Sequence, residues 1–206
     1  MRILYVTSNL RGTDGISRYS LDLTNGVAAR GHGVMCLTHG PFGSGGHFDT
    51  WQCLPAPTKV AVNPFAAYRV ASTLRRASAV FAPDIIHILA GFYAPAVAFL
   101  PGSLRVLVTL HGTYSFVPDI VKSPWQRKIA EAITVQAYRK ACGIITVSSF
   151  TKNYMTVNVQ RLCPSLELEG KTCVITNGID FAAFPLLNRP LKDQSKTKRI
   201  LFVGMV

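Results

Sequence analysis

The sequence predicts an α/β fold in which a mostly parallel sheet of about seven strands has helices on both faces. Short aliphatic and β-branched runs alternate with segments of helical periodicity along most of the chain, as in consecutive β-α-β units. Glycine and proline stand at the junctions between these segments. Hydrophobic residues make up 49% of the 206 residues and charged residues only 16%, which favours a large buried core.

The first part of the chain is expected to begin the sheet. Residues 2–7 form an aliphatic run, and residues 16–30 follow a glycine-containing turn with helical periodicity. Residues 34–38 are expected to form the second strand, and residues 51–54 a weak third one. The predicted buried face of the first helix consists of Ile16, Tyr19, Leu23 and Val27.

The middle of the chain predicts a capped helix and two more strands. Asn63 is the expected N-cap, and Pro64 occupies the first helical position. The apolar positions of this helix recur at helical spacing and are Ala66, Val70, Leu74, Ala77 and Phe81. Pro83 should end it. Strands are then expected at residues 85–89 and 105–110, around a short apolar helix.

A second capped helix is expected from Ser123-Pro124-Trp125-Gln126, read as a capping box, to about residue 141. Its predicted apolar face contains Trp125, Ile129, Ile133 and Ala137, with a basic face around Glu131 opposite. A buried face on a core helix explains this pattern, and so does contact with an anionic membrane surface. Residues 144–147, 149–161 and 173–176 complete the pattern as strand, helix and strand.

Charge and cysteine content narrow the class of protein. The formal charge of +12 favours anionic partners, but the basic residues are scattered and no nucleic-acid-binding motif accompanies them. The five cysteines have no zinc or redox spacing, so we expect reduced thiols in a cytoplasmic protein. The start of the chain has no signal-peptide pattern.

Several turns that follow predicted strands carry candidate ligand-binding residues, because ligands of parallel sheets bind beyond the carboxyl ends of the strands. Gly12, Asp14 and Gly15 follow the first strand, but their spacing is not that of a dinucleotide-binding fingerprint. His111 and Gly112 follow the strand at 105–110, and that histidine could donate a hydrogen bond or titrate.

The remaining candidate positions have strong structural alternatives. Ser148 is more simply explained as a helix cap, and Asn177, next to Gly178, as a turn residue. His87 lies within a predicted strand and is expected to be a buried histidine with a hydrogen-bond partner. No catalytic triad, pair of acids or metal cluster is apparent from the spacing.

Taken in order, these motifs resemble retaining glycosyltransferase family 4, the GT-B group that includes bacterial lipid-linked sugar transferases and sucrose-phosphate synthase-like enzymes. The segments that carry the resemblance are MRILYVTSNL at 1–10, DGISRY at 14–19, ARGHGV at 29–34, PDIIH at 83–87, TLHG at 109–112, ITVS at 145–148, ITNGID at 175–180 and RILFVG at 199–204.

The resemblance implies a Rossmann-like N-terminal half of a GT-B fold. Residues 1–180 would form the acceptor-side domain, residues 181–198 a linker, and residues 199–206 the first strand of a truncated C-terminal domain that binds most of the donor. The donor would be a nucleotide-diphospho-sugar, and the acceptor a hydroxyl of a glycan or lipid-linked molecule. No metal and no further cofactor are expected, and the chain alone should be inactive.

The resemblance also implies roles for individual residues. His111 would lie against the transferred sugar as the catalytic histidine. The substrate contacts would come from Gly12, Asp14, Gly15, Arg18, Gly112, Ser148 and Asn177. Where the family commonly has Gly-Gly, this chain has Asp14-Gly15, and the acid could repel phosphate or bind an acceptor hydroxyl. Because the donor phosphate is thought to help deprotonate the acceptor in retaining enzymes, no protein base is expected.

Three alternatives remain open at this stage. An inverting GT-B enzyme would use Asp14 or a histidine near the first loop as a base. A non-catalytic module that binds sugars or phosphates would be complete at 206 residues. A basic nucleic-acid-binding protein would show steeply salt-dependent binding. For the glycosyltransferase, the 124–141 helix could add peripheral contact with the inner face of a membrane.

Overall fold

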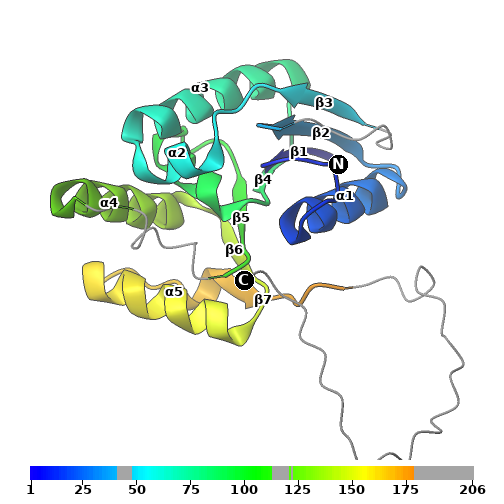
Figure 1. The fold of residues 1–206 in the computed structure, drawn as a ribbon. Coiled ribbons are helices and arrows are strands. Elements are labelled where there is room, and N and C mark those ends of the chain that lie inside the picture. The colour runs from blue at the N-terminus through cyan, green and yellow to red at the C-terminus, as the bar shows by residue number, and fades with distance from the viewer. Residues whose placement is uncertain (41–47, 113–120, 122, 179–206) are drawn as a thin grey trace, which may run out of the picture.

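A computed structural model describes residues 1–40, 48–112, 121 and 123–178 of the chain (Figure 1). Its elements are β1 (Arg2–Thr7), α1 (Gly15–Ala28), β2 (Gly33–Thr38), β3 (Asp49–Gln52), α2 (Pro57–Val62), α3 (Pro64–Phe81), β4 (Ile85–Ile88), the 3-10 helix η1 (Gly91–Phe99), β5 (Val106–Leu110), α4 (Pro124–Lys140), β6 (Gly143–Thr146), α5 (Ser149–Leu162), the 3-10 turn η3 (Glu169–Lys171) and β7 (Thr172–Val174). The predicted linker and the strand at 199–206 lie outside the described residues.

The strands form one parallel sheet of seven strands in the order β3-β2-β1-β4-β5-β6-β7. The chain leaves β1 toward β2 and β3 on one side, and later returns to place β4 on the other side. The strand order therefore reverses between β1 and β4. In open α/β sheets the carboxyl ends at such a reversal open into a crevice that ligands use. The predicted fold class is confirmed.

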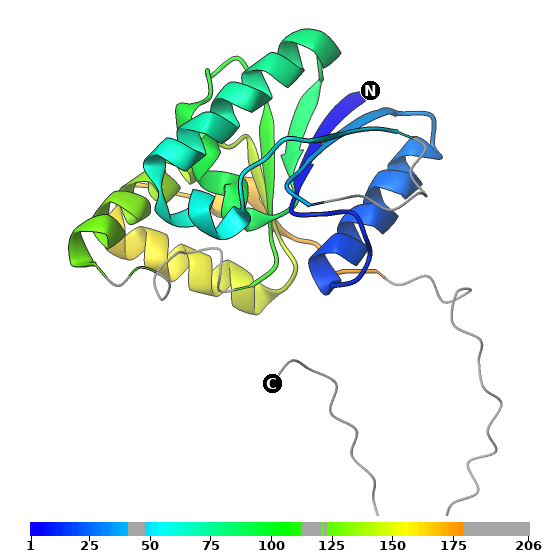
Figure 2. The same cartoon turned by 45° about the horizontal axis from the view of Figure 1, so that its top comes forward.

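The helices cover the two faces of the sheet unequally (Figures 1 and 2). The larger core includes Leu4 and Val6 of β1 together with buried residues of α2, α3, η1, α4 and α5. The smaller core includes Tyr5 and packs against half-buried residues of α1. Successive side chains of a strand point to opposite faces, so β1 contributes to both cores. Both faces carry helices, as predicted.

Helix α1 buries hydroxyls where the sequence predicted aliphatic side chains. Its fully buried residues are Ser17, Ser20 and Thr24, and the predicted apolar face is only half-buried beside them. The Ser20 Oγ lies 2.8 Å from the Thr7 Oγ1 of β1, and Thr24 donates to the Ser20 carbonyl at 2.8 Å. Small residues on this stripe let the helix axis approach the sheet, because no long side chain stands between them.

Helix α3 confirms its predicted start and end. The Asn63 Oδ1 accepts from the backbone N–H groups of Phe65 and Ala66, at 2.9 and 3.4 Å. At the other end Ala82 adopts a left-handed conformation with φ of 45°, which stops the helix before Pro83. The six-residue helix α2 before it was not predicted, because a segment this short lacks a full period of apolar positions.

Helix α4 corrects two predictions about its sequence. The side chain of Ser123 caps no backbone N–H, so the predicted capping box does not form, although Pro124 does occupy the first turn. Trp125 is 71% exposed and lies outside the core, whereas Glu131, assigned to the solvated face, is only 8% exposed. The carboxylate of Glu131 is buried because Arg127 and Arg161 pair with it, at 3.3 and 3.4 Å.

Smaller differences concern strand ends. The predicted strand at 51–54 lies two residues earlier, as β3 at Asp49–Gln52, and β7 ends at Val174 rather than at residue 176. Among the described residues, no helix is long and apolar enough to cross a membrane.

Candidate active site

The candidate site lies at the carboxyl edge of β1, β4 and β5, the three strands at the reversal of strand order. His111 directly follows β5, and the first loop follows β1 and leads into α1. The ring of Tyr19, in the second turn of α1, contacts the imidazole of His111, with ring centroids 4.7 Å apart and planes at 74°. The contact shows that the first loop and His111 lie on the same side of the molecule.

One nitrogen of His111 is buried without a partner. The Nε2 atom has no hydrogen bond within the described part of the chain. Burial lowers the pKa of His111, and a hydrogen bond with the backbone of Leu89 acts against this shift. Because Nε2 has no partner, the bond to Leu89 is assigned to Nδ1, which then carries the proton. The neutral ring therefore has an unused acceptor, the lone pair of Nε2.

Next to His111, a row of buried and half-buried polar side chains extends across neighbouring strands of the sheet. The side chain of Thr109 lies next to Tyr19, acting against the rise in the Tyr19 pKa that burial causes, and the Thr109 Oγ1 lies 2.8 Å from the Nε2 of His87. The ring of His87 in turn lies 5.5 Å from that of Tyr5. Burial, with a smaller contribution from His111, lowers the pKa of His87 to about 3. His87 is thus a neutral buried histidine with a partner, as predicted.

The first loop holds a closed hydrogen-bonded turn around Asp14. The Asp14 Oδ1 accepts from the Ser17 N–H at 2.9 Å, and the Asp14 N–H donates to the Ser17 Oγ at 3.1 Å. Asn9 donates to the other carboxylate oxygen at 3.1 Å. Burial acts to raise the pKa of Asp14, but the hydrogen bonds from Ser17, Asn9 and Ile16 outweigh it, so this pKa is lowered. Asp14 is therefore an ionised helix cap.

The two glycines of the loop serve different purposes. Gly12 has φ of +72°, a conformation in which a side chain would be strained. Gly15 has no such requirement, and a Cβ placed there would meet nothing within 4 Å. Its bare backbone therefore leaves open space at the start of α1.

Of the other predicted site residues, Arg18 and Ser148 form contacts within the fold, whereas Gly112 and Asn177 border open space or solvent. The exposed Arg18 pairs with Asp22 one helical turn later, with Nε and Oδ2 2.8 Å apart. The Ser148 Oγ accepts from the Thr151 N–H at 3.1 Å and thus caps α5, which is the structural alternative of the sequence analysis. Gly112 follows His111 with open space on its Cβ side, and Asn177 is exposed beyond the end of β7.

Two residues of this region were missed as site residues. Tyr19 was assigned to an apolar helix face, and Thr109 was treated only as part of a strand. Thr109 lies near the end of β5 and His111 just after it, and side chains two apart in extended backbone point to the same face, so this spacing carried a usable signal. Nothing in the sequence indicated that α1 would bring Tyr19 between them.

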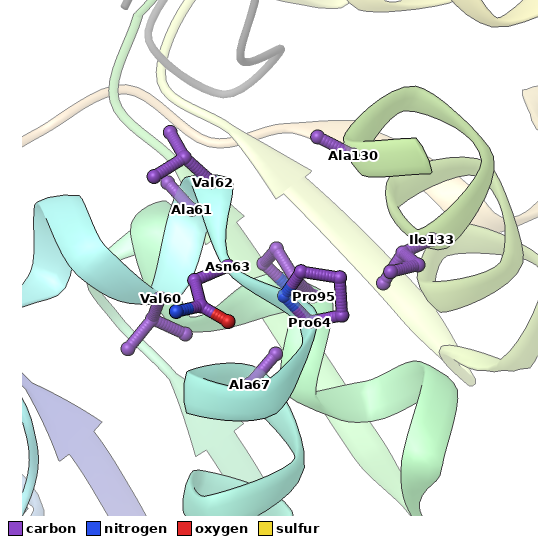
Figure 3. A pocket seen from close by; sticks show the side chains of 9 residues that line it. All are labelled: Val60, Ala61, Val62, Asn63, Pro64, Ala67, Pro95, Ala130 and Ile133. Carbon is purple, nitrogen blue, oxygen red and sulfur yellow. The ribbon is translucent and has the colours of Figure 1, made fainter. Parts of the chain in front are cut away.

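A separate hollow lies among the helices of the larger core, on the face of the sheet away from α1, and Figure 3 shows the side chains that line it. It encloses about 170 Å³, including its mouth, between α2, the start of α3, Pro95 and two residues of α4. Its lining is apolar except for Asn63, whose Oδ1 already caps α3. It therefore offers little to a phosphate or a sugar. Within the described ranges, no three His, Cys, Asp or Glu side chains gather where they could hold a metal ion.

A family model described as Glycosyltransferase Family 4 matches residues 13–183 of the chain. The chain belongs to Glycosyltransferase Family 4. The match includes the first loop from Thr13 onward, His111 and the turn after β7. No curated protein shows a significant sequence match.

Solved structures of other proteins share the fold of this chain. Sucrose-phosphate synthase from Thermosynechococcus elongatus matches with a TM-score of 0.61 at 15% identity, over 89% of this chain and 50% of that one. HepE from Anabaena, in complex with UDP, matches with a TM-score of 0.59 at 15% identity, over 88% of this chain and 45% of that one.

A glycosyltransferase from Rickettsia africae matches with a TM-score of 0.57 at 18% identity, over 92% of this chain and 46% of that one. The family 4 chain thus has the fold of these proteins and spans about half the length of each.

Proposed function

We propose that this chain is the acceptor-side domain of an enzyme that transfers a sugar from a nucleotide-diphospho-sugar to a hydroxyl acceptor with retention. The observation that carries the proposal is the buried, unpartnered Nε2 of His111 at the carboxyl edge, beside the first loop. A buried polar atom without a partner is costly, and a ligand that completes it removes the cost. Family membership indicates which ligand to expect.

The chemistry of His111 suits a sugar hydroxyl. With the proton on Nδ1, Nε2 accepts a hydrogen bond, and the hydroxyl of a bound sugar donates one. The lowered pKa of His111 keeps the ring neutral at physiological pH. A neutral imidazole orients the sugar without placing a cation next to the anomeric carbon, where positive charge develops in transfer. His111 would therefore position the transferred sugar rather than deliver a proton.

The first loop suits the approach of a donor diphosphate. Gly15 leaves open space at the start of α1, so a diphosphate could approach its bare backbone, although the ionised Asp14 already caps the first N–H groups of that helix. Asp14 has both carboxylate oxygens engaged and a lowered pKa, so it is poorly prepared to act as a base. This disfavours an inverting mechanism based on Asp14 and supports retention. A UDP-type donor is suggested by HepE, whose structures contain UDP and UDP-glucose.

The test is a transfer assay on the gene product that carries residues 1–206 in its natural context, and on residues 1–206 alone. A panel of radiolabelled nucleotide-diphospho-sugars is offered with membrane lipid and oligosaccharide acceptors. We expect transfer by the natural product and none by residues 1–206 alone. NMR of the product gives its anomeric configuration, and an inverted product would refute retention.

His111→Ala should lower transfer at least tenfold, with unchanged far-UV circular dichroism. The matched control is His32→Ala, since His32 lies between α1 and β2 at the opposite edge of the sheet. Unchanged turnover in His111→Ala would remove His111 from the site. Tight binding of a sugar phosphate without transfer to any acceptor would favour the non-catalytic module, and salt-dependent binding to any DNA duplex would favour the nucleic-acid protein.

We also propose that α4 contacts an anionic membrane surface, and the charge of the outer helices supports this second element. Helices α2, α3, α4 and α5 contain one acidic residue, Glu131, which is buried between two arginines. Their cations are Lys59, Arg69, Arg75, Arg76, Arg127, Lys128, Arg139, Lys140, Lys152 and Arg161. Lys128 and the indole of Trp125 are exposed near the start of α4, a pairing typical of residues at a lipid interface.

Sedimentation with lipid vesicles tests this contact. We expect the chain to bind vesicles that contain phosphatidylglycerol and to release them in salt, with little binding to phosphatidylcholine alone. Trp125→Ala should weaken binding several-fold. Val157→Ala, which replaces an exposed side chain of α5, serves as the control. Equal binding to neutral and anionic vesicles would contradict an electrostatic contact.

A further inference from the structure

The contact between Tyr19 and His111 joins two elements that are far apart in the sequence. Tyr19 belongs to α1, and His111 follows β5. Their rings meet edge to face, with centroids 4.7 Å apart and planes at 74°. Such a contact limits rotation of an imidazole about its χ2 angle, because a rotated ring would either overlap the tyrosine ring or no longer contact it.

The tyrosine ring is itself held from behind. Burial raises the pKa of Tyr19 and the neighbouring Thr109 side chain acts against this shift, and the Thr109 Oγ1 lies 2.8 Å from the Nε2 of the buried His87. The tyrosine hydroxyl thus lies next to the Thr109 side chain of β5, which itself contacts His87.

We propose that Tyr19 is a positioning residue for His111. Its ring supports the imidazole from α1, while its hydroxyl lies next to Thr109. The Leu89 backbone holds Nδ1 and Tyr19 holds the plane of the ring, so the buried Nε2 keeps one direction. The inference rests on the proposed function only in naming a sugar hydroxyl as the group that Nε2 receives.

The surroundings of His111 define what a titration would report. Among the described residues, the titratable groups recorded next to it are Tyr19 from α1 and His87 from β4, with Tyr5 of β1 next to His87. Burial lowers the pKa of His111. Removing the tyrosine ring admits water to the imidazole, which should move the pKa back toward the ordinary histidine value of 6.5.

The experiment is a proton NMR titration of the histidine rings in residues 1–206, with the His111 resonance assigned by its loss in His111→Gln. We expect Tyr19→Leu to raise the pKa of His111 and to shift its ring protons, because the ring current of the tyrosine is gone. Tyr19→Phe keeps the ring and should move both quantities less. An unchanged His111 titration in a folded Tyr19→Leu chain would overturn the proposal.

Tyr68→Leu is the matched control. The ring of Tyr68, on α3, makes a similar edge contact with Phe99, at 6.0 Å and 88°, on the other face of the sheet. It should leave the His111 titration unchanged, and an equal shift there would also overturn the proposal. The wild-type chain provides a test that does not depend on whether a variant folds. Nuclear Overhauser contacts between the ring protons of Tyr19 and His111 are expected, and their absence refutes the contact.

Transfer kinetics in the natural gene product separate this inference from the proposed function. Tyr19→Leu should lower kcat at least tenfold and change KM for the donor less, and Tyr19→Phe should recover most of the rate. If NMR shows the coupling but the enzyme transfers no sugar, the proposed function fails and the positioning role stands. If transfer occurs and Tyr19→Leu leaves both kcat and the titration unchanged, the positioning role fails.

Discussion

His87 should make the stability of the fold depend on pH in a specific window. The side chain is 7% exposed, and burial lowers its pKa to about 3, whereas the unfolded chain titrates near 6.5. Between these values the unfolded state binds the proton and the folded state does not. Stability from neutral His87 is therefore present above about pH 6.5 and is lost as the pH falls toward 3. Linkage gives a loss of about 2 kcal/mol between pH 7 and pH 5.

The perturbation is His87→Gln, which keeps an amide close to the position of Nε2 and removes the titration. Urea unfolding followed by circular dichroism at pH 7, 6 and 5 gives the free energy of unfolding of both chains. The wild-type chain should lose about 2 kcal/mol more than His87→Gln between pH 7 and pH 5. The control His39→Gln replaces an exposed histidine and should follow the wild-type curve. Parallel pH curves for wild type and His87→Gln would refute the reasoning.

Three further predictions concern local structure. Asn63→Ala should lower the free energy of unfolding by about 1 kcal/mol, while Ser123→Ala, at the cap that does not form, should change it by about 0.3 kcal/mol or less in urea unfolding. Gly12→Ala should cost about 1–2 kcal/mol at its positive φ, whereas Gly15→Ala should cost nothing and should instead impair transfer if a donor phosphate approaches there. Lys171→Met should lower the thermal midpoint by several degrees and destabilise by about 1–3 kcal/mol, since the Nζ of Lys171 donates to three carbonyls at the end of α4 and just beyond it.

The fold was predictable because it depends on local signals that agree with one another. The aliphatic strands, the Asn63-Pro64 start of α3 and the stop before Pro83 each have a short-range cause, and each is present as predicted. The failures have long-range causes. Ser123 looks like a cap in sequence, but whether its hydroxyl turns toward the helix depends on the chain that enters it. Glu131 could be buried only because Arg161, thirty residues later, comes to its carboxylate.

For the candidate site, the sequence placed His111 and the first loop at the carboxyl edge of the sheet, where the structure has them, but it did not indicate their contacts. The rule that ligands bind at the carboxyl edge selected His111 and the first loop from the order of strands alone. The same rule selected Ser148, whose hydroxyl is engaged as a helix cap. The contact of Tyr19 with His111 depends on how α1 packs on the sheet, and that packing follows from the small buried residues Ser17 and Ser20. Small polar residues of this kind do not contribute to an apolar periodicity, so the periodicity does not indicate that they are buried.

The acid-poor layer formed by α2, α3, α4 and α5 has a consequence for how the protein senses its surroundings. These helices contain no histidine, and their single carboxylate is held between arginines. The positive charge of these four helices comes from lysine and arginine, residue types that ordinarily stay protonated well above neutral pH. The positive potential of this layer should therefore respond to ionic strength and to the anionic lipid content of a bilayer, while acidification of the medium leaves it unchanged.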